Sequence, residues 1–191
     1  MSRIITGTLA SQRVISPPGV ATRPTTDRVR EAIFSVLASW YEGVDRDSGQ
    51  QLEGVQFLDL YAGSGVVGLE AYSRGAAVTW VDKATTSVIE KNLDRLHVRG
   101  TVKRMDVERF LHGRSTQFDI VWMDPPYENY NESIYRILTL LRDQKWLKIG
   151  GFVLIERSSH TSAVEFPESF ISVGQRRYGG TIIYHAEMGN Q

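Results

Sequence analysis

The fold is decided by the stretch Asp59-Leu60-Tyr61-Ala62-Gly63-Ser64-Gly65-Val66-Val67-Gly68, which continues a short apolar run that begins at Val55. Its glycines match the pattern G-x-G-x-x-G, which joins a strand to a helix in folds that bind dinucleotides and related adenosyl cofactors. Glycine lets the backbone turn sharply and approach a ligand closely. The stretch therefore predicts a buried strand, a glycine loop and a helix that begins at Val66.

Outward from this loop, strand-like and helix-like segments alternate along the chain, which favours a parallel sheet with helices on both faces. The predicted strands are residues 77–81, 101–103, 118–123 and 152–156, and the predicted helices are residues 66–73, 87–96, 107–111 and 133–141. A capping box at residues 87–90 is expected to begin the second of these helices. Residues 170–177 and 181–184 flank Gly179-Gly180 and predict a hairpin, so the sheet should close with an antiparallel pair.

The residues before the glycine loop predict a small N-terminal extension. Two short strands are expected at residues 3–8 and 13–15, followed by a helix that begins near Thr25 or Thr26 and carries an apolar stripe. A polar linker at residues 45–51 separates this part from the rest. The predicted organisation is an extension at residues 1–44 and a main domain at residues 52–191; a family resemblance described below implies that the extension helps to hold cofactor and RNA.

Composition narrows the classes of function. The chain has 191 residues and a formal net charge of zero, which excludes a globally basic nucleic-acid binder. It contains no cysteine, which excludes disulfides, thiolate metal sites and a cysteine nucleophile, and its four histidines show no ligand spacing. No apolar run is long enough to span a bilayer. Residues 1–41 nevertheless carry five arginines against two acids, a local excess of positive charge that suits either a phosphate backbone or a solvated helix face.

Three acids end three successive predicted strands. Asp59 stands before the glycines, where a dinucleotide would bring its negative pyrophosphate; a carboxylate there better matches a positive group, so an NAD(P)-dependent oxidoreductase is disfavoured. Asp82 follows the second strand and can bind a ribose, although it could also be a turn residue. Asp106 follows the third and can accept a hydrogen bond from an adenine amino group, although it could equally cap the next helix. Ligands of open α/β sheets bind at these strand ends.

The strand at residues 118–123 runs directly into Asp124-Pro125-Pro126-Tyr127. A carboxylate, a carbonyl held by the following proline, a stiff turn and an aromatic ring then stand together at one edge of the sheet. These groups suit a planar base with an exocyclic amino group, because the two oxygens accept its hydrogens and the ring stacks on the base. The alternative is a proline-rich turn in which Tyr127 packs against the protein.

The chain resembles the RsmD family of class I S-adenosylmethionine-dependent methyltransferases, bacterial enzymes that act on the 2-amino group of one guanine in 16S ribosomal RNA. The resemblance rests on residues 3–7, 22–34, 58–65, 68–71 and 124–127. It implies a Rossmann-like α/β fold with a seven-stranded, mostly parallel sheet whose last strand is inserted antiparallel. It also implies a cytoplasmic, monomeric enzyme without metal or membrane association, acting within a small-subunit ribosomal particle. Asp82 stands where glutamate is commoner in the family, and either carboxylate can serve.

The resemblance further implies roles for individual residues. The expected catalytic residues are Asp124, Pro125 and Tyr127. Cofactor binding is expected of Asp59, Tyr61, Gly63, Gly65, Asp82, Lys83, Asp106 and Asp124. RNA contacts are expected of Arg23, Arg28, Arg30 and Tyr127. Two alternatives stay open at this point: an amino-methyltransferase acting on a DNA base or a protein glutamine, and a non-catalytic RNA-binding factor of ribosome assembly.

Overall fold

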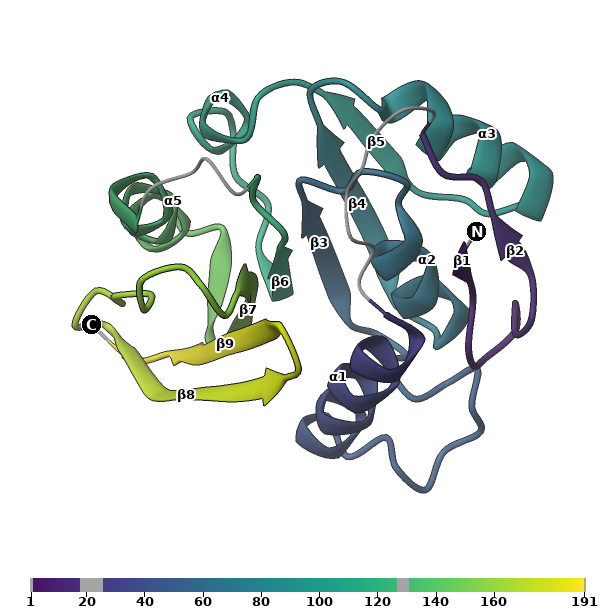
Figure 1. Cartoon of the computed structure of the whole chain (residues 1–191), viewed down its shortest axis with the longest axis horizontal. Coiled ribbons are helices and arrows are strands. Elements are labelled where there is room, and N and C mark those ends of the chain that lie inside the picture. Colours follow the sequence, from purple (N-terminus) through teal and green to yellow (C-terminus); the bar gives the residue numbers. More distant parts are fainter. Residues whose placement is uncertain (1, 18–25, 127–130, 191) are drawn as a thin grey trace.

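A central β-sheet with helices on both faces makes up most of the protein in the computed structural model, which describes residues 2–17, 26–126 and 131–190 (Figure 1). The sheet contains β3 (Gln56–Leu60), β4 (Ala77–Asp82), β5 (Thr101–Arg104), β6 (Phe118–Met123), β7 (Leu147–Ser158), β8 (Phe170–Tyr178) and β9 (Thr181–Met188). Its strand order is β5-β4-β3-β6-β7-β9-β8. The first five are parallel, whereas β9 is inserted antiparallel to both β7 and β8. The predicted fold class is therefore confirmed.

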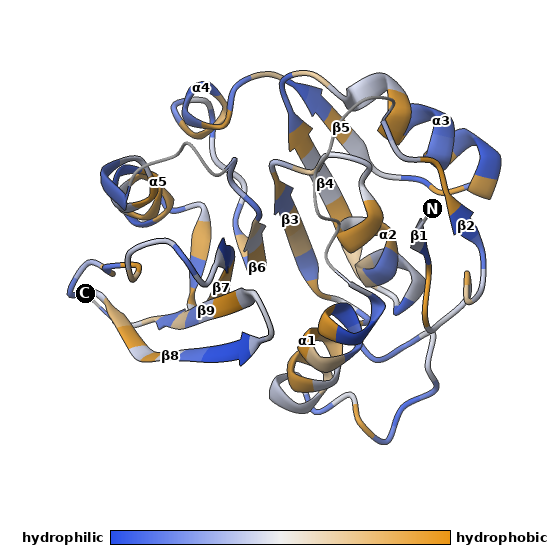
Figure 2. Ribbon diagram, in the orientation of Figure 1, coloured by the Kyte–Doolittle hydropathy of each residue, from blue (hydrophilic) through white to orange (hydrophobic). Residues whose placement is uncertain are grey.

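Among the described residues, five helices cover the two faces of the sheet. They are α1 (Asp27–Trp40), α2 (Val66–Ser73), α3 (Thr86–Leu96), α4 (Val107–Leu111) and α5 (Asn131–Asp143). The first three pack into one hydrophobic cluster and the last two into another. Side chains of β3 alternate between these clusters, because Phe57 joins the first and Leu58 the second. The resulting apolar strands and half-apolar helices are visible in Figure 2.

Helix α1 begins where the sequence predicts. Thr26 is its N-cap, and the Thr26 hydroxyl accepts a hydrogen bond from the backbone N–H of Val29 at 3.3 Å. The predicted stripe buries Ile33 and Leu37 against the sheet. Helix α3, in contrast, begins at Thr86 with Thr85 as its N-cap, and no side chain caps it. The predicted capping box at residues 87–90 is therefore wrong, since these residues already lie within the helix.

The N-terminal extension packs directly on the main domain. Its hairpin consists of β1 (Ser2–Arg3) and β2 (Arg13–Val14), and the intervening loop is held by Glu70 of α2. The buried Glu70 carboxylate accepts hydrogen bonds from the N–H groups of Ile5 at 2.7 Å and Thr6 at 3.1 Å, and it pairs with Arg74 at 3.0 Å. The buried Glu70 carboxylate thus fixes the extension to helix α2, and its own hydrogen-bonding capacity is satisfied there.

The register of the sheet sets which residues meet at the carboxyl ends of the parallel strands. Leu60 pairs with Val81 on one side and with Met123 on the other, and Met123 pairs with Ile155. These strands therefore end side by side. The residues just after or beside these pairs form one continuous edge, and all acids predicted for the site except Asp106 lie on it.

Candidate active site

The loop between β3 and α2 has the backbone conformation that its glycines suggest. Gly63 has φ +57° and Gly65 has φ +78°, both in the left-handed region that side chains disfavour, and Gly65 is the N-cap of α2. Tyr61 is a non-glycine residue in the same region, with φ +60°. The loop therefore turns sharply and leaves its backbone open to a ligand at the N-terminus of a helix.

The third glycine of the motif serves the packing of the helix. A Cβ atom at Gly68 would lie 2.2 Å from Nε1 of Trp80, which could not be accommodated. The Trp80 indole N–H instead donates to the Gly65 carbonyl at 3.2 Å. The backbone N–H of Gly68 donates to Oδ2 of Asp59 at 2.9 Å. Gly68 thus lets α2 approach both β3 and β4 closely.

Asp82, at the end of β4, holds the glycine loop from the other side. Its Oδ2 accepts the N–H of Gly63 at 3.0 Å, and its Oδ1 accepts the N–H groups of Ala84 at 2.7 Å and Thr85 at 2.8 Å. Asp82 therefore does stabilise the turn that follows β4, as the alternative interpretation of the sequence suggested. An ionised carboxylate offers about four acceptor sites, so capacity for a ribose hydroxyl is left. The neighbouring Lys83 is exposed.

Asp59 is a buried carboxylate, with 1% of its surface exposed. Burial raises its pKa to about 7; the hydrogen bond from Gly68 lowers it, and the charge of Asp82 raises it. A negative charge is costly here without a nearby cation. The site thus favours a positively charged group beside Asp59.

Asp106 has a different role in the structure. It is the N-cap of α4, and its Oδ1 accepts the N–H of Glu108 at 2.9 Å. The alternative considered for Asp106, a cap of the next helix, is therefore confirmed. The carboxylate is exposed just beyond β5, so contact with an adenine amino group stays a prediction.

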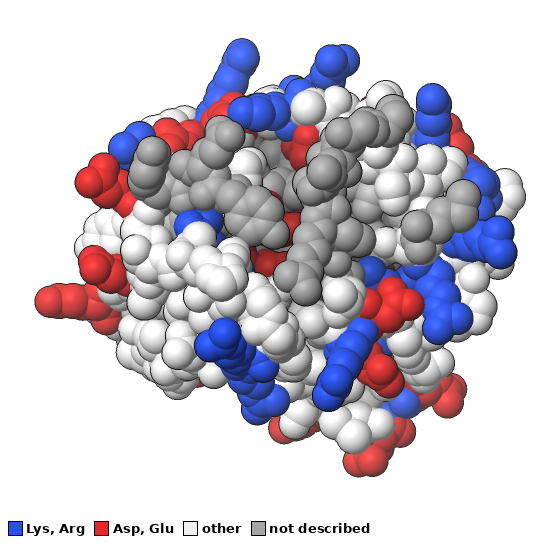
Figure 3. Space-filling model, in the orientation of Figure 1, with Lys and Arg blue, Asp and Glu red and all other residues white. Residues whose placement is uncertain are grey.

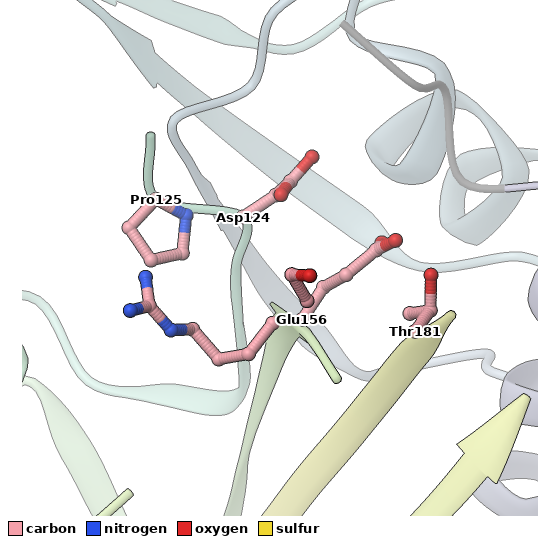
Figure 4. Close-up of a pocket in the computed structure, with 6 residues that line it drawn as sticks. Asp124, Pro125, Glu156 and Thr181 are labelled. Carbon is pink, nitrogen blue, oxygen red and sulfur yellow. The ribbon is translucent and has the colours of Figure 1, made fainter. Parts of the chain in front are cut away.

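Asp124 and Pro125 line a small recess that is partly open to solvent. Its other lining residues are Glu156, Arg157, Ser158 and Thr181. Figure 4 shows the Asp124 and Glu156 carboxylates extending toward the same space. In Figure 3, acidic atoms are visible within a hollow near the centre of the molecule. Most of the Lys and Arg side chains in that view lie toward the outer edge of the molecule.

The environment of Asp124 is strongly acidic. Asp124 is exposed to solvent on one side, while its carboxylate lies close to many protein atoms on the other. Burial raises the pKa of Asp124 well above its ordinary value, the charges of Glu156 and Asp59 raise it further, and Arg157 lowers it. Within the described ranges, no hydrogen bond to the Asp124 side chain is found. Tyr127, the third expected catalytic residue, lies outside the described residues.

Glu156 and Arg157 line this recess, although neither is predicted as a site residue from the sequence. Both are buried beside Asp124 at the end of β7. The signal was present, because Glu156 ends an apolar run as Asp82 and Asp124 do. The same criterion of an acid at a strand end would have found it.

The three arginines expected to contact RNA differ in position. Arg28 is exposed on α1, whereas Arg23 lies outside the described residues. Arg30 is fully buried; its guanidinium donates to the carbonyl of Arg3 and pairs with Asp27 at 2.8 Å. The expectation for Arg30 is therefore corrected: it holds α1 on the hairpin, and a phosphate could reach it only if the helix moved.

A fully buried asparagine joins the extension to the glycine loop. The Asn92 side chain, on α3, accepts from the N–H of Ile15 at 2.9 Å and donates to the carbonyl of Ile15 at 3.0 Å. The same amide donates to the carbonyl of Ser64 at 3.1 Å. One side chain thus fixes both the end of the hairpin and the glycine loop.

The part of the chain that the structure describes shows neither a metal site nor a membrane-spanning helix. No group of three or more His, Cys, Asp or Glu side chains there could hold a metal ion. The helices of that part are all too short or too polar to cross a membrane.

Comparison with known proteins identifies the family. The family model described as Conserved hypothetical protein 95 matches residues 2–187. Ribosomal RNA small subunit methyltransferase D of Escherichia coli strain K12 is 31% identical over 186 residues, covering 95% of this chain and 87% of that protein. The chain belongs to the RsmD family.

Two further comparisons extend the similarity over nearly the full length of the chain. The Bacillus subtilis protein YlbH is 33% identical over 195 residues, covering 95% of this chain and 97% of YlbH. The solved structure of the Escherichia coli protein yhhF is 29% identical with a TM-score of 0.83, covering 100% of this chain and 99% of that one. As a member of the RsmD family the chain is a methyltransferase, and its cofactor is S-adenosylmethionine.

The residues of the site fit this cofactor. S-adenosylmethionine carries a sulfonium and an ammonium group, and the edge that would receive them concentrates the carboxylates of Asp59, Asp124 and Glu156. Burial raises the pKa of both Asp59 and Asp124, so a negative charge on either is costly unless a cation lies nearby. The sharp turn at Gly63, which is only half-buried, lets the loop backbone approach an adenosyl group closely. A dinucleotide, which brings two further negative charges, fits this edge less well.

Proposed function

We propose that this RsmD family protein transfers a methyl group from S-adenosylmethionine to the exocyclic 2-amino group of a guanine in 16S ribosomal RNA. The observation that carries the proposal is the position of Asp124 and Pro125, which face a recess at the strand ends next to the glycine loop. The relative from Escherichia coli is a small-subunit ribosomal RNA methyltransferase over nearly the same length. Both lines support an amino group of ribosomal RNA as the acceptor.

The cofactor would lie across the ends of β3 and β4. The backbone of the loop at Gly63 and Gly65 would receive its adenosyl part, and Asp82 would bind its ribose hydroxyls. Asp59 would face its positive amino acid end, and the exposed Asp106 its adenine. Tyr61 and Lys83 flank the same loop and would complete the site.

S-adenosylmethionine supplies an electrophilic methyl group on a positively charged sulfur. The protein must make the guanine amino nitrogen nucleophilic, because its lone pair is delocalised into the ring in free guanine. The Asp124 carboxylate and the Pro125 carbonyl would accept its two hydrogens and direct the lone pair toward the donor. Orientation of this kind can supply up to about 7–11 kcal/mol of rate acceleration.

Charge changes along the reaction also favour Asp124. As the carbon–nitrogen bond forms and the carbon–sulfur bond breaks, positive charge moves onto the amino nitrogen, and an adjacent carboxylate stabilises it. The nitrogen then loses one proton. The raised pKa of Asp124 makes it a stronger base than an ordinary aspartate, so it could take this proton before release to solvent.

The RNA would approach over the N-terminal extension. Arg28 is exposed there and would contact phosphates, as would Arg23. The target base would leave its stack to reach Asp124, with Tyr127 stacking on its face. We place the reaction in the cytoplasm, with a small-subunit ribosomal particle as the substrate. The enzyme would act as a monomer.

The proposal is tested with purified protein, isotopically labelled S-adenosylmethionine and small ribosomal subunits from cells that lack the gene. The expected result is a single N2-methylguanosine, located by mass mapping of 16S RNA and absent when Asp124→Ala protein is used. Label incorporated only into a DNA duplex or into protein glutamine would overturn the choice of substrate. Cofactor binding without any transfer would instead support a non-catalytic factor.

A further inference from the structure

Glu156 lies next to Asp124 because of the strand register. Met123 of β6 stands opposite Ile155 of β7, so the residues that follow them, Asp124 and Glu156, are neighbours across the two strands. Paired residues of adjacent parallel strands project to the same face of a sheet. Glu156 is 8% exposed and lines the same recess as Asp124.

Thr181 extends this arrangement by one more polar group. In the antiparallel pairing of β7 with β9, Glu156 stands opposite Ile183, and Ser158 opposite Thr181. Because side chains alternate along a strand, Thr181 projects to the same face as Glu156. It is a diagonal neighbour of Glu156, at a spacing that long side chains can bridge. Figure 4 shows Asp124, Glu156 and Thr181 in that order along the recess.

The order carboxylate, carboxylate, hydroxyl is complementary to one edge of guanine. That edge presents the 2-amino group and N1–H, both donors, followed by O6, an acceptor. An ionised carboxylate can only accept hydrogen bonds, whereas a hydroxyl can donate one. Adenine presents a lone pair at N1, which a carboxylate at this place would repel. Enzymes that act on an extruded base read this edge through such hydrogen bonds.

We propose that Glu156 is a specificity-determining residue whose carboxylate accepts the N1–H of the target guanine, while the Thr181 hydroxyl donates to O6. The proposal rests on the proposed function, because it requires the guanine 2-amino group to lie at Asp124. It assigns the recess to recognition of the base, beyond the chemistry at the amino group. A site built to accept a hydrogen bond from its substrate reacts more slowly with an analogue that lacks the donor, by about 10⁴-fold in favourable cases.

A purely structural role for Glu156 predicts a different result. Its charge also acts on the buried Arg30 of α1, so Glu156 could serve only to hold the extension in place. Loss of that support would lower methylation of every base by the same factor. Loss of base recognition would change the ratio between bases.

The test compares two synthetic RNAs that differ at the modified position, which mass mapping locates first. One carries guanine and the other 2,6-diaminopurine, which keeps the 2-amino group but presents a lone pair at N1 and an amino group at position 6. Wild-type protein is expected to prefer guanine by at least ~100-fold in initial rate. Glu156→Gln should reduce this preference at least ~10-fold, because its amide can donate to the N1 lone pair. The dissociation constant for S-adenosylmethionine should stay within about threefold of wild type, since Glu156 is assigned to the base.

Glu187→Gln provides the matched control. Glu187 lies toward the other end of β9, opposite Phe152, and this variant should retain both the rate and the preference. Thr181→Val is the second variant and should reduce the preference by about 3- to 10-fold, the worth of one hydrogen bond. It keeps the proposal testable if Glu156→Gln does not fold.

Two results would overturn the proposal while leaving the proposed function intact. One is equal methylation of both bases by wild-type protein, and the other is an equal loss on both bases in Glu156→Gln. Absence of methylation of the guanine RNA and of ribosomal subunits by wild-type protein would overturn the proposed function, and the role of Glu156 with it.

Discussion

The two halves of the strand edge treat their acids differently. At the ends of β3 and β4, the protein itself supplies donors: Asp82 accepts three backbone N–H groups and Asp59 accepts one. At the ends of β6 and β7, Asp124 and Glu156 lie side by side; burial raises the pKa of Asp124, and the charges of Glu156 and Asp59 raise it further. We propose that the first half, held by backbone donors, receives the cofactor, and that the second half, the substrate half, receives a ligand that brings its own donors, as a guanine amino group does.

Removing Asp124 should have the largest effect. Asp124→Ala is expected to lower the methylation rate at least ~1000-fold, because both orientation and charge stabilisation are lost. The dissociation constant for S-adenosylmethionine should change only a few-fold, since the glycine loop held by Asp82 is intact. Single-turnover kinetics and calorimetry measure the two quantities. A comparable rate in the variant would contradict the role of the substrate half.

Asp59→Asn should separate cofactor affinity from stability. The amide can still accept from Gly68, but it lacks the charge that favours a cation, so cofactor affinity should fall about 10- to 100-fold. Without cofactor, the variant should be more stable than wild type above pH 7. Titration calorimetry and urea denaturation give both values. Unchanged affinity would show that no cationic group lies beside Asp59.

The pH dependence of this stability has a definite sign. Because burial raises the pKa of Asp59 from 3.8 to about 7, the folded state binds a proton that the unfolded state has already released. The contribution of Asp59 to the free energy of unfolding therefore decreases as the pH rises from about 4 to about 7, and is constant above. At 1.36 kcal/mol per pH unit, the decrease is on the order of 4 kcal/mol. The contribution should be absent in Asp59→Asn, which denaturation at several pH values would reveal.

Asn92→Ala tests the link between the extension and the cofactor loop. It removes the partner of Ile15 and Ser64 inside the protein, so the free energy of unfolding should fall by about 1–3 kcal/mol. Hydrogen exchange at the Ile15 amide should accelerate. Glu90→Ala, on the exposed face of the same helix, is the control and should change little. Slow exchange at Ile15 in the variant would mean that other contacts hold the extension.

The smallest effect is expected for Arg28→Ala. One exposed phosphate contact should cost a few-fold in RNA affinity and reduce the slope of log affinity against log salt by about one. Arg46→Ala, in the polar linker, is the control. Equal slopes for the two variants would assign Arg28 to a solvated helix face.

Local pattern was sufficient for much of the fold. Helix α2 and strand β6 occupy exactly their predicted ranges, because each combines one apolar run with clear boundaries at glycine or proline. The start of α3 was misplaced because Asp82, outside the helix, binds the N–H of Thr85 and takes over part of the capping. Strand β7 begins earlier than predicted, at Leu147, because Gly150 and Gly151 accommodate an irregular register with β6 instead of ending the strand.

The positions of Asp59, Asp82 and Asp124 at the carboxyl ends of their strands were predictable, because each lies at the end of one apolar run. The role of a residue was not predictable where neighbours in space decide it. Arg30 looks like a surface cation in the sequence, and only the packing of α1 on the hairpin buries it against Asp27. Glu156 ends an apolar run, as Asp82 and Asp124 do, but its position beside Asp124 follows from the register between β6 and β7, which no single segment of the sequence contains.

The most direct test of the central claim is a crystal structure of the protein with S-adenosylmethionine bound. The account predicts that the donor lies along the ends of β3 and β4, with its ribose at Asp82 and its sulfonium methyl group directed at the recess beside Asp124. A donor bound elsewhere, or one whose methyl group points away from Asp124, would contradict the account.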